Sequence, residues 1–154
     1  MAKQEIGDLE QIRQKLEGWL VSRIPNVEDF TLGELNFPEF SGESSVTLIM
    51  EANWQEAGHA RNERFVLRMA PIISQVFETH DLKLQYQLME VMNKEGIPAP
   101  SLVGYEPDTT LLGSDFYVMD FVDGIVPPDN PPMAFGSWVS ELSPEDRATM
   151  WHNG

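Results

Sequence analysis

The sequence contains no cysteine, and this absence excludes disulfide bonds, thiolate metal ligands and a cysteine nucleophile. Basic residues are few: ten lysines and arginines stand against 25 aspartates and glutamates, which gives a formal net charge of −15. Nucleic acids and anionic membranes attract clustered positive charge, so we expect neither as a partner. No apolar run approaches the roughly 20 residues of a membrane-spanning helix, and the start MAKQEIGDLEQ lacks the apolar segment of a secretory signal. We therefore expect a cytoplasmic protein.

The composition that remains is typical of one globular domain. Of the 154 residues, 42% are hydrophobic and 23% are charged. From Leu9 to Leu20, apolar residues recur at helical spacing, after a capping Asp8 and before Pro25. This pattern predicts an amphipathic helix at the amino end of the chain.

Five β-type segments and a second helix follow. The first three segments are joined by short turns, which favours an antiparallel meander: DFTLGELNF, VTLIMEANW and ERFVLRMA. The segment HDLKLQYQLMEVMNKEG then predicts a helix that begins after Asp81 and ends at Gly96. Two more strands are predicted in SLVGYEP and DFYVMDFVDG. The expected fold is α+β, with a mostly antiparallel five-stranded sheet and one helix packed on it.

The last part of the chain differs in character. Four prolines between residues 124 and 142 prevent regular strand pairing and predict a stiff connection. A new helix is predicted after it, because Ser143 can cap it, Pro144 suits its first position and Asp146 completes a capping box.

Several motifs in this order resemble the amino-terminal part of the aminoglycoside phosphotransferase-like family, which has a protein-kinase-like fold. They span roughly residues 30 to 150: FSGESSVTLIM, RFVLRMAP, GIPAPSLVGYEPD, LLGSDFYVMDFVDG and the helix start SPEDRATM. Beside the amino-terminal helix (1–27), which the apolar pattern predicts, the resemblance implies a kinase-like nucleotide-binding lobe (28–124), and a connection with the first helix of a larger lobe (125–154). It also implies ATP or GTP with magnesium as cofactors of the complete enzyme, which transfers the γ-phosphoryl group to a hydroxyl of an unknown small molecule.

The resemblance assigns residues to the phosphate side of the nucleotide. Backbone amides and hydroxyls of a small-residue loop would bind phosphate oxygens: Ser41, Gly42, Ser44 and Ser45. Arg68 stands where such enzymes have a basic residue on the third strand, although a strand-edge arginine paired with an acid remains an alternative. The glutamate that orients this cation is replaced by Gln85, with Glu78 and Glu90 as possible substitutes.

The resemblance also assigns residues to the nucleobase. Val46 and Val66 would form an apolar roof over it. In the hinge after the last strand, Met119 would close the back of the pocket, the Asp120 carbonyl would accept from the base, and the Val122 N–H would donate to it. Two alternatives are consistent with the same sequence: the loop is an ordinary hairpin turn, and the hinge is an ordinary strand end.

The catalytic motifs of the family are missing from this sequence. It has no His-Gly-Asp loop, and His59, His80 and His152 follow no metal-ligand spacing. We therefore expect an incomplete lobe, inactive alone, with a face that invites self-association where the larger lobe would cover it. Two alternatives remain open: a non-catalytic interaction module that retains the kinase-like small-lobe fold, and an unrelated α+β binding domain.

Overall fold

The computed structural model describes residues 7–38, 45–70, 81–125 and 136–153 of the chain. The chain divides into two compact units, residues 1–122 and residues 123–154. The first unit contains the sheet and the helices α1, α2 and α3, and the second contains α4 (Trp138–Glu141) and α5 (Pro144–Asn153). None of the helices in the described ranges is long and apolar enough to cross a membrane.

The first helix forms where the apolar spacing predicts it. Helix α1 (Leu9–Arg23) begins at Asp8, whose side chain accepts a hydrogen bond of 3.0 Å from the Glu10 amide. Such a cap satisfies one of the free N–H groups of the first turn. The chain becomes extended at Ile24, just before Pro25. The buried side of the helix consists of predicted residues: Ile12, Leu16, Trp19 and Leu20.

In the described ranges, five antiparallel strands form a single sheet in the order β1-β2-β3-β5-β4, which confirms the predicted α+β class. The strands are β1 (Glu28–Leu32), β2 (Val46–Glu56), β3 (His59–Met69), β4 (Leu102–Glu106) and β5 (Phe116–Asp120). Strands β2 and β3 form a long hairpin whose two-residue turn has positive φ angles at Ala57 (49°) and Gly58 (79°). Left-handed conformations at both positions match the twist of an antiparallel hairpin.

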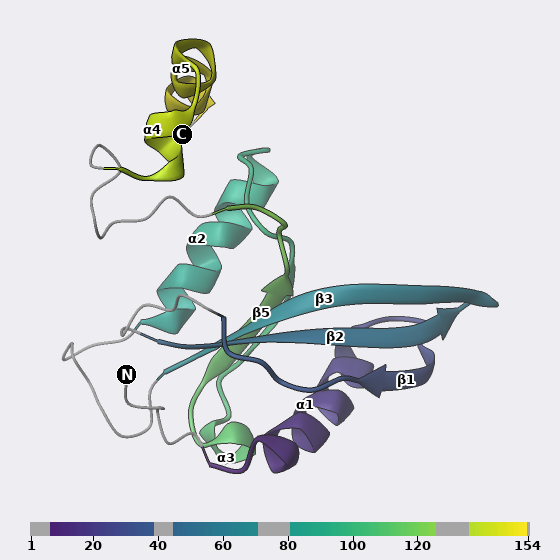
Figure 1. The fold of residues 1–154 in the computed structure, drawn as a ribbon. Helices are drawn as coiled ribbons and strands as arrows, with labels where there is room; N and C mark the ends of the chain where they lie inside the picture. Colours follow the sequence, from purple (N-terminus) through teal and green to yellow (C-terminus); the bar gives the residue numbers. More distant parts are fainter. Residues whose placement is uncertain (1–6, 39–44, 71–80, 126–135, 154) are drawn as a thin grey trace. The chain divides into compact units, whose positions relative to one another are not determined.

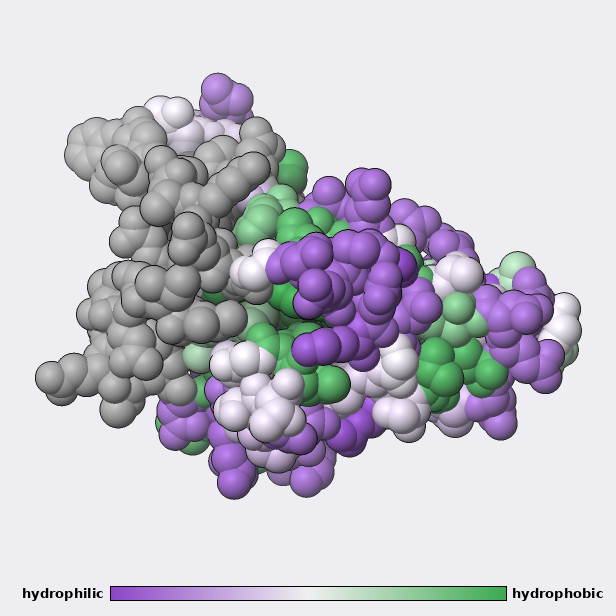
Figure 2. Space-filling view, turned by 90° about the horizontal axis from the view of Figure 1, so that it is seen from below, coloured by the Kyte–Doolittle hydropathy of each residue, from purple (hydrophilic) through white to green (hydrophobic). Residues whose placement is uncertain are grey.

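The two faces of the sheet have different neighbours. Helix α1 covers one face, and α2 (Leu82–Lys94) lies on the other (Figure 1). The main hydrophobic core lies on the α1 side, where alternate residues of the strands are buried. Its largest strand residues are Leu32, Leu48, Met50, Trp54, Phe65, Leu67, Met69 and Phe116. Viewed from the α1 side, hydrophilic side chains dominate the outer surface of the helix, with hydrophobic side chains at its flanks (Figure 2).

Helix α2 buries fewer of its side chains than α1 does. Asp81 caps it by accepting 2.8 Å from the Leu84 amide, and Gly96 follows its end with a φ of 72°. On the side of the helix that faces the sheet, Leu82 is buried, whereas Tyr86, Met89 and Met92 are half-buried.

A short helix that the sequence pattern did not indicate joins β4 to β5. Helix α3 (Thr109–Leu112) is capped by Asp108 and ends at Gly113, which has a φ of 91°. Just before it, the carboxylate of Glu106 accepts from the Asp108 amide (3.0 Å), the Trp19 Nε1 (2.8 Å) and the Arg23 guanidinium (3.2 Å). Glu106 therefore links α1 to the end of β4 and the start of α3.

We predict that Glu106→Gln destabilises the fold in a pH-dependent manner. The hydrogen bond from the Asp108 amide, followed by that from Trp19, holds the pKa of Glu106 below its usual 4.5. The stabilisation is therefore complete above about pH 4.5 and is lost as the pH falls through the folded-state pKa. Hydrogen bonds to charged groups suggest a loss of about 1–3 kcal/mol in unfolding free energy at pH 7, which urea denaturation measures.

The matched control is Glu95→Gln, at an exposed position after α2. Its effect on the unfolding free energy should be within about 0.5 kcal/mol. A Glu106→Gln variant as stable as this control at pH 7 would contradict the role assigned to Glu106.

Candidate functional site

Arg68 lies on the sheet face opposite α1, between side chains that carry hydroxyls. In the strand register, Arg68 pairs with Thr47 of β2 and with Tyr117 of β5. Residues directly opposite in antiparallel strands extend to the same face, so the three side chains are neighbours. Arg68 is half-buried there.

The guanidinium of Arg68 is only partly satisfied. Its Nη2 donates to the Ser45 hydroxyl at 2.6 Å, but its Nε is buried and has no hydrogen-bond partner in the described part of the chain. Within the same residues Arg68 also forms no ion pair, whereas Arg13, Arg23 and Arg61 each pair with a glutamate. A buried donor without an acceptor costs free energy, so this side chain suits an anionic ligand that would supply the missing oxygen.

Within the described residues, Gln85 is hydrogen-bonded to Tyr117, the strand neighbour of Arg68, and not to Arg68 itself. The Tyr117 hydroxyl donates to the Gln85 Oε1 at 3.4 Å. The position that the resemblance assigns to an acid is therefore connected to a tyrosine that pairs with Arg68 in the strand register. Among the possible substitutes, Glu78 lies outside the described residues, and Glu90 forms no ion pair with Arg68.

The three tyrosines of the chain meet between α2 and the sheet, a cluster that the sequence did not indicate. The Tyr86 ring lies 5.7 Å from that of Tyr105 and 6.1 Å from that of Tyr117, between centroids. Burial and a 2.9 Å hydrogen bond to Asp115 raise the pKa of Tyr105 to about 12. Burial also raises the pKa of Tyr117, while the charge of Arg68 lowers it.

The predicted phosphate loop and roof are only partly described. Ser41, Gly42 and Ser44 lie outside the described residues, and Ser45 is buried beside Arg68. Val66 shares the face of Arg68, where it pairs with Ile49 and Met119.

The placement of Val46 beside Val66 in one roof is wrong. Val46 pairs with Met69 and is 1% exposed in the core on the α1 side. Because strand side chains alternate between faces, Val46 and Val66 lie on opposite sides of the sheet. Ile49 lies on the face where Val46 was expected.

The predicted hinge lies at the end of the first unit. Met119 is half-buried opposite Val66, and the Asp120 amide donates to the Ser101 carbonyl at 2.9 Å. Val122 is 64% exposed, and its N–H has no hydrogen-bond partner among the described residues. The Val122 amide is therefore available to a ligand, as the hinge assignment requires. The binding roles of all these residues remain predictions.

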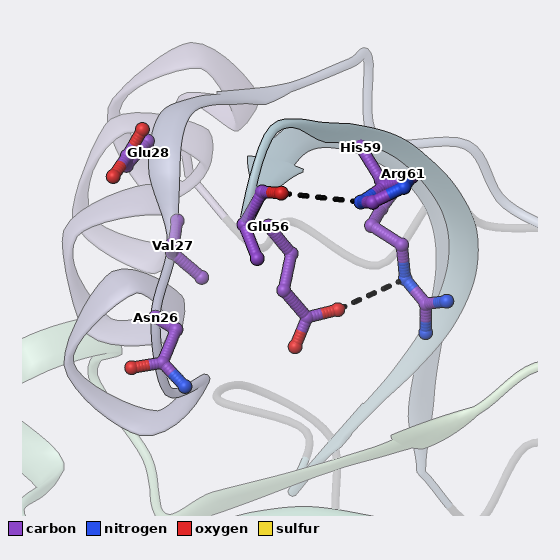
Figure 3. A pocket seen from close by; sticks show the side chains of 7 residues that line it. Asn26, Val27, Glu28, Glu56, His59 and Arg61 are labelled. Carbon is purple, nitrogen blue, oxygen red and sulfur yellow. Dashed lines mark hydrogen bonds and ion pairs between the residues drawn. The ribbon is translucent and has the colours of Figure 1, made fainter.

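A separate pocket lies at the turn end of the β2–β3 hairpin, far along the strands from Arg68. Figure 3 shows the side chains that line it: Asn26, Val27, Glu28, Glu56, Ala57, His59 and Arg61. Arg61 is the basic residue of this pocket, and its charge is neutralised because its guanidinium lies 3.3 Å from Glu56 and 2.8 Å from Glu63. The His59 ring nitrogen lies 3.1 Å from the Ala57 carbonyl oxygen. In the described ranges, no group of three or more histidines and carboxylates is placed to hold a metal ion. Arg68 is therefore the stronger candidate for an anion site.

Comparisons with known proteins give distant relatives. No family model matches the chain. Acyl-CoA dehydrogenase family member 11 from Gallus gallus is 26% identical over 137 residues, which cover 88% of this chain and 16% of that protein. The human protein of the same name is 25% identical over 111 residues, or 72% of this chain and 12% of that protein. The chain thus spans less than a fifth of the length of these relatives.

Among solved structures, the chain is similar to a protein from Ralstonia eutropha described as a "putative aminoglycoside phosphotransferase". The match has 25% sequence identity and a TM-score of 0.47, and it covers 73% of this chain and 28% of that protein. The α+β assignment rests on the strand order and register described above.

Proposed function

We propose that the chain is the nucleotide-binding lobe of an ATP- or GTP-dependent phosphotransferase acting on a hydroxyl of a small molecule. The observation that supports this most directly is the partly satisfied guanidinium of Arg68. It is half-buried beside Ser45, has an unpaired Nε and lacks an ion pair within the described residues. Arginine presents a fixed fork of donors that matches phosphate oxygens and keeps its charge when desolvated.

The neighbours of Arg68 suit the rest of a nucleotide. Val66 and Ile49 are an adjacent pair on the same face, and Met119 pairs with Val66 from β5. These apolar side chains would contact the base, while the Val122 amide would donate to its edge. Phosphate and base would thus be held by β3 and by the end of β5 respectively.

The proposed chemistry depends on positioning and electrostatics. Arg68 would hold the α and β phosphates, so that the γ-phosphoryl group is presented to the acceptor hydroxyl. Magnesium would neutralise phosphate charge when bound. Because the described residues contain no cluster of three metal-ligating side chains, we assign no magnesium ligand to this chain. The magnesium ligands and the catalytic aspartate would belong to a larger lobe beyond these 154 residues, and the chain alone would be inactive.

One observation favours a second candidate, a non-catalytic interaction module with the same fold. Gln85 stands where the resemblance expects a glutamate, and it bonds to Tyr117 instead of Arg68. Such a module would have no need to bind nucleotide. Nucleotide binding by the chain therefore distinguishes the two candidates.

We predict that ATP with magnesium raises the melting temperature of the 154-residue chain. A ligand present at a hundredfold excess over its Kd stabilises a protein by about 2.7 kcal/mol. Arg68→Ala should weaken ATP binding at least tenfold, because it removes a charge-assisted contact to phosphate. The matched control is Arg61→Ala, at the other end of β3, which should leave the ATP-induced shift unchanged. The absence of a shift at millimolar nucleotide, or an undiminished shift in Arg68→Ala, would refute the proposal.

The hinge gives a prediction that is independent of the phosphates. Val122→Pro removes the N–H that would donate to the base, at an exposed position whose amide has no partner in the described chain. Adenosine binding should weaken about tenfold, as for the loss of one hydrogen bond, while pyrophosphate binding should not change. Val122→Ala keeps the N–H and serves as the control. Equal adenosine affinities of the two variants in calorimetric titration would show that this amide does not bind the base.

A further inference from the structure

We propose that Gln85 and Tyr117 are positioning residues of the anion site around Arg68. In this account, which rests on the proposed function, they form a neutral hydrogen-bonded pair that takes the place of a carboxylate partner. Within the described residues, the guanidinium then has no acid to release before it binds an anionic group. The chemical class of ligand is a phosphate or polyphosphate group with several charged oxygens.

The strand register places Tyr117, one member of the pair, beside Arg68. Tyr117 lies opposite Arg68 on β5, with only 2% of its surface exposed. Its hydroxyl donates to the Gln85 Oε1 of α2 at 3.4 Å. Thr47 occupies the corresponding place on β2, and the Ser45 hydroxyl accepts the side-chain hydrogen bond that Arg68 donates within the described residues. Among the described residues, Arg68 is thus flanked by hydroxyl-bearing side chains, and the Gln85 amide joins them through Tyr117.

The neutrality of these surroundings contrasts with the rest of the chain. The sequence has 25 acidic residues, and Arg13, Arg23 and Arg61 all pair with glutamates. Arg68 forms no such pair within the described residues, although its Nε is buried. A carboxylate at this place would satisfy the guanidinium, but it would also repel an incoming phosphate. Neutral partners orient the site without that repulsion.

Aromatic packing fixes the position of the pair. Tyr86 follows Gln85 on α2, and its ring meets those of Tyr105 and Tyr117. Leu82, one turn earlier, is the only side chain of α2 that is buried. These contacts hold the first half of α2 against the sheet. Gln85 lies in this half of the helix and is hydrogen-bonded there to Tyr117.

The test compares two probes on the same 154-residue chain by calorimetric titration. Inorganic pyrophosphate reports the anion site, and adenosine reports the base site. The variants are Tyr117→Phe, which removes the hydroxyl, and Gln85→Glu, which adds a charge at the end of the pair. The control for the hydroxyl is Tyr105→Phe, whose hydroxyl bonds to Asp115 and not to Gln85. The control for the charge is Gln87→Glu, at an exposed position of the same helix.

We expect both variants to bind pyrophosphate about three to ten times more weakly than the wild-type chain, as for the loss of one hydrogen bond or the addition of one nearby charge. Adenosine affinity should be unchanged. A general loss of structure would instead weaken the binding of both pyrophosphate and adenosine. Both controls should bind pyrophosphate like the wild-type chain. Because Gln85 is exposed, Gln85→Glu tests the proposal even if Tyr117→Phe fails to fold.

Three outcomes separate this inference from the proposed function. If Arg68→Ala loses pyrophosphate but both variants behave like their controls, the positioning role is overturned and the nucleotide site stands. If Gln85→Glu binds pyrophosphate more tightly, a carboxylate supports Arg68, and the role of the neutral pair is overturned as well. If Arg68→Ala binds pyrophosphate like the wild-type chain, the proposed function and this inference are both overturned.

Discussion

The antiparallel pairing of β2 with β3 is the constraint on which the rest of the structure depends. Each strand is 11 residues long, and the pairing is continuous from Val46 opposite Met69 to Glu56 opposite His59. A shift of one strand by one residue would move all of its side chains to the opposite face of the sheet. This register buries Leu48 and Leu67 against α1, and it turns Val66 and Arg68 to the opposite face. The same strand register therefore determines both which side chains form the core and which form the candidate site.

Much of the fold follows from local sequence patterns. Asp8 and Asp81 cap helices where they were predicted to, and the positions of the five strands agree with the alternating apolar runs. Helix α3 was missed because four residues are too few to show a helical period, although Asp108 and Gly113 are the residues that begin and end it. The predicted helix start at Ser143 is also confirmed, since the Ser143 hydroxyl accepts from the Asp146 amide at 3.0 Å.

The candidate site was less accessible to sequence reasoning. The placement of Val46 failed because the sequence shows the alternation within a strand but not which residue after the loop faces which side. The tyrosine cluster depends on β5 lying between β3 and β4, and local sequence does not reveal this strand order. Gln85 was recognised from the motif alignment, but its bond to Tyr117 required the position of α2 on the sheet. Contacts between segments distant in the chain are set by tertiary packing, which local propensity does not determine.

The most direct test of the central claim is a crystal structure of the chain with a non-hydrolysable ATP analogue and magnesium. The account predicts phosphate oxygens within hydrogen-bonding distance of the Arg68 guanidinium, one of them bound by Nε, and the base against Val66 and Ile49. A nucleotide bound elsewhere, for example in the pocket between Asn26 and Arg61, with Arg68 still bonded only to Ser45, would contradict it.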